Sequence, residues 1–160
     1  MNYGVYIVTS RSGESINGQT ATSPFQVTSD PLQIAVVINK NNLTHQYISE
    51  GKVFGVCILA KETPLDFIFK FGFFSGRKIN KFENLEHGTG ITGVPLLNKN
   101  TVAVLEAVVV SQADVGTHTI FVGKLVDAKV ISGDEPLTYA YYRIKKAGLT
   151  PTTAPTYLKG

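Results

Sequence analysis

A glycine pattern typical of dinucleotide-binding loops lies at residues 88 to 93, which read GTGITG. In such loops the glycines let the backbone approach a pyrophosphate, and a helix that begins at the third glycine points its N-terminus at the phosphates. The pattern therefore requires a strand before it and a helix after it. Here KFENLEH precedes the motif and VPLLNKN follows it, and Pro95 opposes an ordinary helix interior. We interpret GTGITG as a loop that binds no dinucleotide.

Two polar stretches have a composition suited to a ligand that carries a ring and a phosphate. INGQTATSPFQVTSDP (16 to 31) concentrates hydroxyls, amides and small residues between two apolar runs. NKNNLTH (39 to 45) places Lys40 and several amide and hydroxyl groups where a helix begins, and a helix N-terminus favours an anion. The alternative is an Asn/Ser/Thr-rich turn and an ordinary helix cap, and composition alone does not separate the two.

Other motifs with a chemical mechanism are missing from the sequence. It has no Walker A lysine, no H-E-x-x-H and no G-x-S-x-G, and its histidines (His45, His87 and His118) are too scattered to predict a metal site. The single cysteine, Cys57, lies in the apolar run VFGVCIL, which predicts a buried thiol and excludes an intramolecular disulfide. If the chain is an enzyme, we expect a cofactor to carry the chemistry.

Composition narrows the class of protein. The chain has 160 residues, of which 43% are hydrophobic and 17% charged, and this fits one globular domain over residues 1–160. Fifteen basic and 12 acidic residues leave a net charge of only +3, spread along the chain, so we expect no nucleic-acid partner. No membrane-length apolar run and no signal peptide are evident, and we expect a cytoplasmic protein.

Runs of β-branched and aromatic residues predict a sheet that must position these groups. The predicted strands are GVYIVTS (4 to 10), LQIAVVINK (32 to 40), KVFGVCIL (52 to 59), TVAVLEAVVVS (101 to 111) and HTIFVGKLVDAKVI (118 to 131), with a further candidate in TATSPFQVTS. The last two long strands follow one another across a short turn with no helix between them. This order favours a mainly antiparallel β-barrel over a doubly wound α/β sheet.

Three short helices are expected around this barrel. Thr44 can cap THQYISEG, and Thr63 with Pro64 can open TPLDFIFKFG. Pro136 is expected to open PLTYAYYRIKKAG, which ends at Gly148. The C-terminal segment LTPTTAPTYLKG is rich in proline and threonine, and we expect it to be extended.

At this level of detail the chain resembles the flavin reductase family of FMN-binding split barrels. The resemblance runs, in order, through GVYIVTS, NGQTATSPFQVTSDP, INKNNLTHQYI, FGFFSGRKINKF, GTHTIFVGKLVDAKV and GLTPTTAPTY. It is strongest to the branch in which such a domain occurs alone or fused to rubredoxin. The resemblance implies a mainly β, Greek-key, antiparallel split barrel with short peripheral helices that binds FMN.

The resemblance also implies roles for particular residues. The segment that would line the isoalloxazine ring comprises Asn17, Gln19, Thr20, Ala21, Thr22 and Ser23, largely through backbone groups and hydroxyls. The residues that match the phosphate and ribityl site are Asn39, Lys40, Asn42 and Thr44.

The resemblance implies a function for three further residues, which the sequence pattern alone would not single out. Arg77 and Lys81 would reach the phosphate or a partner subunit, although both also fit the description of solvated basic residues after a helix. His118 matches a family histidine near the reactive face of the flavin that is associated with nicotinamide binding. Without the resemblance it would be interpreted as a surface histidine at the end of a strand.

The implied activity is an NAD(P)H-dependent flavin reductase. A hydride from NADH or NADPH would reduce FMN, and electrons would then pass to oxygen, free flavin, ferric iron or a redox protein such as rubredoxin. A homodimer is expected, with contacts from GTGITGVPLL, FGFFSG and PTTAPTYL. Two alternatives stay open, namely an FMN electron carrier without a nicotinamide site and a split barrel that binds no flavin.

Overall fold

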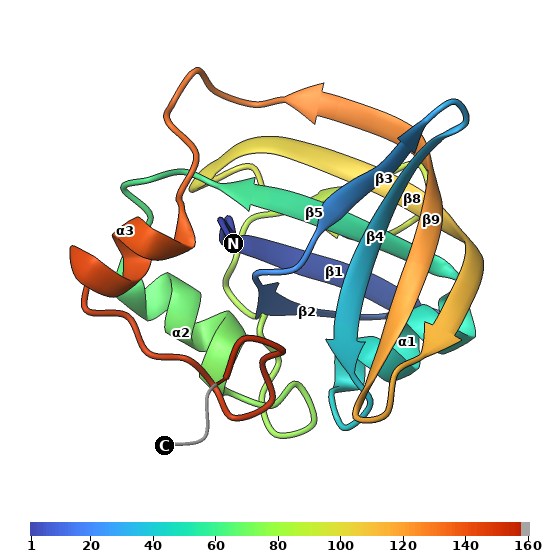
Figure 1. The fold of residues 1–160 in the computed structure, drawn as a ribbon, viewed down its shortest axis with the longest axis horizontal. Coiled ribbons are helices and arrows are strands. Elements are labelled where there is room, and N and C mark those ends of the chain that lie inside the picture. Colours follow the sequence, from blue (N-terminus) through green and yellow to red (C-terminus); the bar gives the residue numbers. More distant parts are fainter. Residues whose placement is uncertain (158–160) are drawn as a thin grey trace.

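The computed structural model describes residues 1–157, and most of its regular structure is β-strand (Figure 1). In chain order the elements are β1 (Tyr6–Ser12), β2 (Ser15–Ala21), β3 (Phe25–Ser29), β4 (Leu32–Asn39), α1 (Leu43–Gly51), β5 (Val53–Leu59), α2 (Leu65–Phe73), β6 (Gly88–Thr89), β7 (Pro95–Leu96), β8 (Thr101–Asp114), β9 (His118–Val130) and α3 (Tyr139–Ile144). The mainly β fold with short peripheral helices is therefore as predicted.

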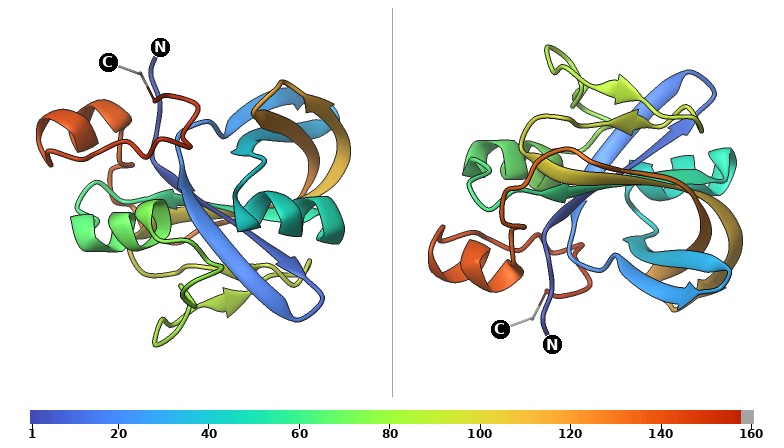
Figure 2. Two further views of the ribbon diagram at one scale, coloured as in Figure 1. Left: turned by 90° about the horizontal axis from the view of Figure 1, so that it is seen from below. Right: turned by 90° about the horizontal axis from the view of Figure 1, so that it is seen from above.

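Seven strands form one antiparallel sheet in the order β2-β1-β5-β8-β9-β4-β3. The long strands β8 and β9 carry register shifts between Glu106 and Ala107 and between Val109 and Ser111, and bulges of this kind increase the local twist. The sheet curls strongly as a result (Figure 2). Its edge strands β2 and β3 follow one another in sequence but do not pair, so the barrel is open along this seam.

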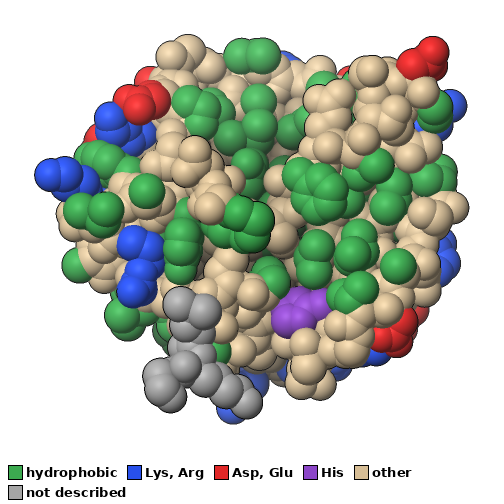
Figure 3. All heavy atoms as spheres, in the orientation of Figure 1, with side chains coloured by type: hydrophobic (Ala, Val, Ile, Leu, Met, Phe, Trp, Pro, Cys, Tyr) green, Lys and Arg blue, Asp and Glu red, His purple; other side chains and the backbone are tan. Residues whose placement is uncertain are grey.

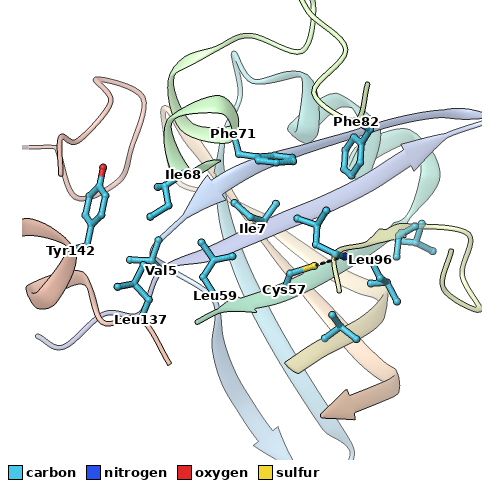
Figure 4. Packing of buried hydrophobic residues seen from close by; sticks show 14 residues of the cluster. Val5, Ile7, Cys57, Leu59, Ile68, Phe71, Phe82, Leu96, Leu137 and Tyr142 are labelled. Carbon is cyan, nitrogen blue, oxygen red and sulfur yellow. Dashed lines mark hydrogen bonds between the residues drawn. The ribbon is translucent and has the colours of Figure 1, made fainter. Parts of the chain in front are cut away.

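Two clusters of buried apolar side chains hold the structure together. One includes Phe54, Phe121 and Ile48, and it joins α1 to the concave side of the sheet. The other joins the sheet to α2, to α3 and to the segment after β6 (Figure 4). Cys57 belongs to the second cluster, where its Sγ accepts a hydrogen bond from the backbone N–H of Leu97 at 3.4 Å. Burial raises the pKa of this thiol to about 12, so Cys57 is the structural thiol that its apolar neighbours predict.

The strands predicted from apolar runs are present, with ends that coincide or shift by up to three residues. TATSPFQVTS contributes β3. The sequence pattern predicts no strand over the polar residues INGQT, and this is wrong, because the segment forms β2 and pairs with β1 along its whole length. An edge strand that turns one side toward a polar cavity does not need an apolar alternation, so the pattern that identifies the other strands is missing here.

The helices are present, but their first residues differ from the prediction. Asn42 is the N-cap of α1, Pro64 that of α2 and Thr138 that of α3. Thr63 instead donates its hydroxyl to the carbonyl oxygen of Ala60 at 2.6 Å, which fixes the turn before α2. The third helix spans only six residues and ends before the two lysines. None of the helices in the described part of the chain is long and apolar enough to cross a membrane.

The GTGITG motif comprises the two-residue strand β6 and the turn that leads from it toward β7. Its donors bind a carboxylate of the chain itself, because the side chain of Glu106 on β8 accepts bonds from the N–H of Ile91 (3.1 Å), the N–H of Thr92 (2.9 Å) and the hydroxyl of Thr92 (2.7 Å). The following residues VPLL are buried, and Val94, Leu96 and Leu97 pack in the second cluster of this chain, whereas the predicted dimer contact of GTGITGVPLL stays a prediction.

Candidate functional site

A cavity of about 210 Å³ lies at the open seam of the barrel. Its walls come from β2, the end of β4, the start of α1, the end of α2 and the loop that follows α2. Residues after α3 form a further wall, and in Figure 1 this tail runs from α3 past α2 toward the ends of β4 and β9. The cavity therefore lies where the edge strand β2 has no strand partner on its outer side.

The end of the cavity near α1 is lined by side-chain amides that are held in place by one another. Asn17 donates from Nδ2 to the hydroxyl of the buried Thr44 at 2.9 Å, and Asn42 donates from Nδ2 to Oε1 of Gln19 at 3.1 Å. Each amide keeps a second polar atom outside these bonds. Asn42 is the N-cap of α1 but makes no side-chain cap bond, and the first turn of α1 has no acidic residue.

Among the described residues, Lys81 is the only charged residue that lines the cavity. Its buried Nζ donates to the carbonyl oxygens of Gly18 and Phe71, each at 2.9 Å. An ammonium has three donors, so these two bonds leave one N–H for a ligand. Burial away from water disfavours the charged form and lowers the pKa of Lys81 to about 8.

The backbone opposite Asn17 approaches it closely at Gly76. A Cβ on residue 76 would lie 2.2 Å from Oδ1 of Asn17, so only glycine fits without displacing that amide. Gly76 and Ser75 both line the cavity. The loop after α2 is thus shaped to bring its backbone, and then Lys81, against β2.

The other end of the cavity combines hydroxyls with apolar side chains. Thr20 donates its hydroxyl to the carbonyl oxygen of Ile68 on α2 at 2.9 Å, and the hydroxyl of Thr22 lies 3.5 Å from that of Thr156. Val5, Ile68, Phe71, Tyr139 and Tyr142 provide apolar surface. One end of the cavity is therefore suited to an anion and the other to an apolar ring with polar edges.

The structure brings together most of the residues predicted to bind a cofactor. Those that line the cavity are Asn17, Gln19, Thr20, Ala21, Thr22, Asn39, Asn42, Thr44 and Lys81. Those outside its lining are Ser23, Lys40, Arg77 and His118. The Ser23 hydroxyl donates to the carbonyl oxygen of Val37 at 3.2 Å instead.

The basic residues outside the cavity have other partners or positions. Lys40 forms an ion pair with Asp114 across the ends of β4 and β8, at the surface. Arg77 faces an outer hollow that it shares with Glu14 and Lys78, beside the cavity but not in it. Of the three basic residues predicted from the sequence, only Lys81 therefore lines the cavity, and it lines the outer hollow as well.

His118 begins β9 and makes two hydrogen bonds. Its Nδ1 lies 2.8 Å from the hydroxyl of Thr117, and its Nε2 lies 3.1 Å from the carbonyl oxygen of Thr153 in the tail. Thr153 lines the cavity, so His118 contacts the cavity wall through this bond without lining the cavity itself.

Sequence reasoning missed the contribution of the tail to the cavity. Residues 151 to 157 were expected to be extended, but they form turns in which Ala154 N–H donates to Pro151 and Tyr157 N–H donates to Ala154. Much of the segment from Leu149 to Thr156 lines the cavity. The dense prolines and threonines were the available signal, and the predicted dimer contact of this segment extends to Leu158, which lies outside the described residues.

Comparison with known proteins shows what this architecture is similar to. A family model described as "Flavin reductase like domain" matches residues 1–149. A ferric-chelate reductase (NAD(P)H) of Archaeoglobus fulgidus is 51% identical over 159 residues, which cover 99% of this chain and 94% of the relative. A high molecular weight rubredoxin of Moorella thermoacetica is 48% identical over 160 residues, which cover 100% of this chain and 70% of the relative.

Solved structures show the same fold. An NADH:FAD oxidoreductase of Streptomyces globisporus superposes with a TM-score of 0.78 at 25% identity, covering 86% of this chain and 81% of that one. An FMN-binding protein of Thermus thermophilus superposes with a TM-score of 0.74 at 25% identity, covering 81% and 73%.

Proposed function

Because the chain belongs to the flavin reductase like domain family and is thus an NAD(P)H-linked flavin oxidoreductase, we propose that it holds FMN in the cavity at the barrel seam. The observation that carries this proposal is the gathering of the Asn17, Asn42 and Thr44 side chains around one end of the cavity, with the buried ammonium of Lys81 in the same wall.

The chemistry of this end fits a phosphate monoester. Such a group carries a charge of about −1.5 to −2 near neutral pH and binds best to charge-assisted donors. Lys81 supplies the cation, Asn42 and Thr44 supply side-chain donors, and the uncapped first turn of α1 supplies backbone N–H groups with a favourable helix dipole. We assign these groups to the phosphate.

The other end fits the isoalloxazine ring. Thr20 and Thr22 present hydroxyls and edge-strand backbone, and Phe71 and Tyr142 present apolar surface. Cofactor pockets usually enclose roughly 300 to 1,000 Å³. The cavity of about 210 Å³ therefore encloses only part of such a cofactor as the chain stands.

When bound, FMN would accept a hydride from the nicotinamide and pass electrons on to an acceptor. The chain's own residues bind the phosphate, orient the ring and exclude water from one side of it, and positioning of this kind can lower a barrier by several kcal/mol. No nucleophile or metal ion is required from the chain. We assign His118 to the nicotinamide side because it adjoins the wall formed by the tail.

Anaerobic reduction tests this function. The purified protein loaded with FMN is mixed with NADH and, separately, with NADPH, and flavin absorbance is followed near its visible maximum. Bleaching by either donor is expected. If neither donor bleaches a bound flavin, the chain is an electron carrier without a nicotinamide site. A protein that fails to quench FMN fluorescence contradicts flavin binding in the cavity.

Two acceptors are supported by the relatives. One relative is named a ferric-chelate reductase, and another is named a high molecular weight rubredoxin. We propose that reduced flavin in this chain passes electrons to a ferric chelate or to a rubredoxin-type protein. Steady-state NAD(P)H oxidation with ferric citrate, with rubredoxin and with each omitted distinguishes these acceptors, and an equal rate in all cases points to oxygen or free flavin instead.

A homodimer is the assembly that the surface favours. The β3–β4 hairpin exposes Phe25 (52%), Val27 (47%) and Leu32 (39%), and apolar side chains gather over this side of the molecule (Figure 3). Contiguous apolar patches are uncommon on monomers. Sedimentation of the wild-type protein and of a Phe25→Ser variant tests the proposal, with a shift of the variant toward monomer expected and a monomeric wild type contradicting it.

A further inference from the structure

The tail, residues 149–156, forms one wall of the cavity. The family model ends at residue 149, yet Thr150, Pro151, Thr153, Ala154, Pro155 and Thr156 all line the cavity. Pro151 reaches α2, since a Cβ on Gly72 would lie 3.9 Å from its Cγ. The tail therefore adds a wall to the site beyond the residues that the family model matches, and the relatives that are 51% and 48% identical also align across it.

The tail is fastened strongly at its first residues. The buried Tyr142 donates its hydroxyl to the carbonyl oxygen of Leu149 at 2.6 Å, and Arg143 donates to the carbonyl oxygen of Gly148, also at 2.6 Å. The hydroxyls of Tyr139 and Thr150 are bonded to each other. These contacts hold the segment to α3 and fix the point from which it crosses the cavity.

The far part of the tail is fastened lightly. Its carbonyl at Thr153 accepts from Nε2 of His118 at 3.1 Å, and its hydroxyl at Thr156 lies 3.5 Å from that of Thr22. A carbonyl oxygen only accepts, so Nε2 of His118 carries a proton. In the neutral ring Nδ1 is then an acceptor, and the hydroxyl of Thr117 donates to it. Both ring nitrogens of His118 are engaged within the chain.

We propose that residues 149–156 form a strap that closes over the flavin and slows its release, with His118 as the positioning residue that latches the strap through Thr153. The proposal rests on the proposed function, because it takes the cavity to be the flavin site. It makes FMN a retained group in this chain, since the strap covers the end of the cavity near Thr20 and Thr22.

The geometry gives the strap a reason to open. The cavity of about 210 Å³ encloses less volume than cofactor pockets usually do, so a wall that moves outward would give FMN more room. The far part of the strap is a wall with few fastenings, since the His118 bond and a long hydroxyl contact hold it to the rest of the chain. The sheet and α2, in contrast, are held by the buried core.

The test measures the release of FMN directly. FMN-loaded protein is diluted far below its dissociation constant, and the rise in flavin fluorescence gives the release rate. His118→Ala removes the latch, and losing one hydrogen bond should speed release by about threefold to tenfold. His118→Gln keeps an N–H donor and should restore part of the wild-type rate.

A matched control is available in His87. This histidine is also half-buried and also has a ring nitrogen near a carbonyl oxygen, that of Gly88 at 3.2 Å. Gly88 does not line the cavity, whereas Thr153, the partner of His118, does. His87→Ala should release FMN at the wild-type rate. Amide hydrogen exchange in residues 149–157 of the flavin-free protein should rise in His118→Ala and not in His87→Ala.

The outcomes separate the two proposals. Wild-type protein that binds no FMN overturns the proposed function, and the retention role of the strap with it. Wild-type protein that binds FMN but releases it no more slowly than His118→Ala overturns the strap alone. Faster release from His118→Ala, with partial recovery in His118→Gln and an unchanged His87→Ala, is the expected result.

Discussion

The GTGITG turn and the α1 end of the cavity both direct polar donors toward a single point, but they differ in what occupies that point. In the turn, the carboxylate of Glu106 accepts all three donors that converge on it. A Cβ on Gly90 would lie 2.2 to 2.3 Å from the atoms of this carboxylate, so the middle glycine of the motif gives room to an internal anion.

At the α1 end of the cavity, the donors surround an open volume. Asn42 caps no backbone group of α1, and two bonds leave Lys81 with an N–H to spare. A donor set that is satisfied within the chain contributes to folding, whereas one that keeps free capacity around a cavity is available to a ligand. A glycine pattern therefore does not identify an anion-binding site by itself. Whether the converging donors already have a partner within the chain decides it.

Replacing Glu106 should have the largest effect and should act on folding alone. Glu106→Ala leaves the N–H groups of Ile91 and Thr92 without a partner and opens a cavity, so we expect the free energy of unfolding to fall by about 3 to 4 kcal/mol. Urea denaturation measures this. Asp127→Ala is the matched control, since Asp127 faces Glu106 across the β8–β9 pair and is exposed. FMN affinity of the folded variant should be unchanged, and a large loss would mean that the turn is part of the flavin site.

Replacing Lys81 should act mainly on the ligand. Lys81→Met keeps much of the side-chain volume and removes the cation, so FMN affinity should fall by about tenfold to a hundredfold, the range of a charge-assisted bond. Riboflavin, which has no phosphate, should lose no more than about threefold on the same scale. Fluorescence titration of both flavins measures this. Lys70→Met is the control, because the half-buried Lys70 also bonds a backbone carbonyl, that of Glu83 at 3.3 Å, but does not line the cavity. Equal losses for FMN and riboflavin would place the phosphate elsewhere.

The pKa of Lys81 predicts a pH dependence of a smaller size. Burial lowers this pKa to about 8 in the flavin-free protein, and a phosphate beside the ammonium would raise it. Binding of FMN then takes up a proton above pH 8, so FMN affinity should fall by up to about tenfold per pH unit above that value. Riboflavin affinity should stay flat from pH 7 to 9.5, and so should FMN affinity in Lys81→Met. A pH-independent wild type would show that the ammonium does not face the phosphate.

The same shift affects stability with a defined sign. The pKa of Lys81 is lower in the folded chain than its ordinary value of 10.5, so the unfolded chain binds more protons between about pH 8 and 10.5. This group therefore makes the flavin-free protein more stable as the pH rises through that window. Urea denaturation at pH 7.5 and 9.5 should show a smaller gain in Lys81→Met than in the wild type.

The sequence predicted the elements that obey a strong local pattern. Apolar runs located β1, β4 and β5 because consecutive residues of these strands are buried, and they located β8 and β9 through their β-branched residues. It did not predict β2, whose polar residues line a cavity and so lack an apolar alternation. It also did not predict the turns of the tail, whose position depends on contacts with Tyr142 and with the distant His118. Local charge also misled, because the sequence showed three basic residues near the expected phosphate site, and only burial distinguishes Lys81 from Lys40 and Arg77.

Lys40 provides the smallest expected effect and the sharpest check on that distinction. It follows Asn39, which lines the cavity, but its own side chain pairs with the exposed Asp114 at the surface. Exposed ion pairs contribute little, so Lys40→Ala should change FMN affinity by no more than about twofold. The titrations with FMN and riboflavin used for Lys81→Met measure this as well. If Lys40→Ala instead weakened FMN by tenfold and spared riboflavin, the phosphate would lie at the surface beside the ends of β4 and β8. The buried ammonium would then be a structural group, like Glu106.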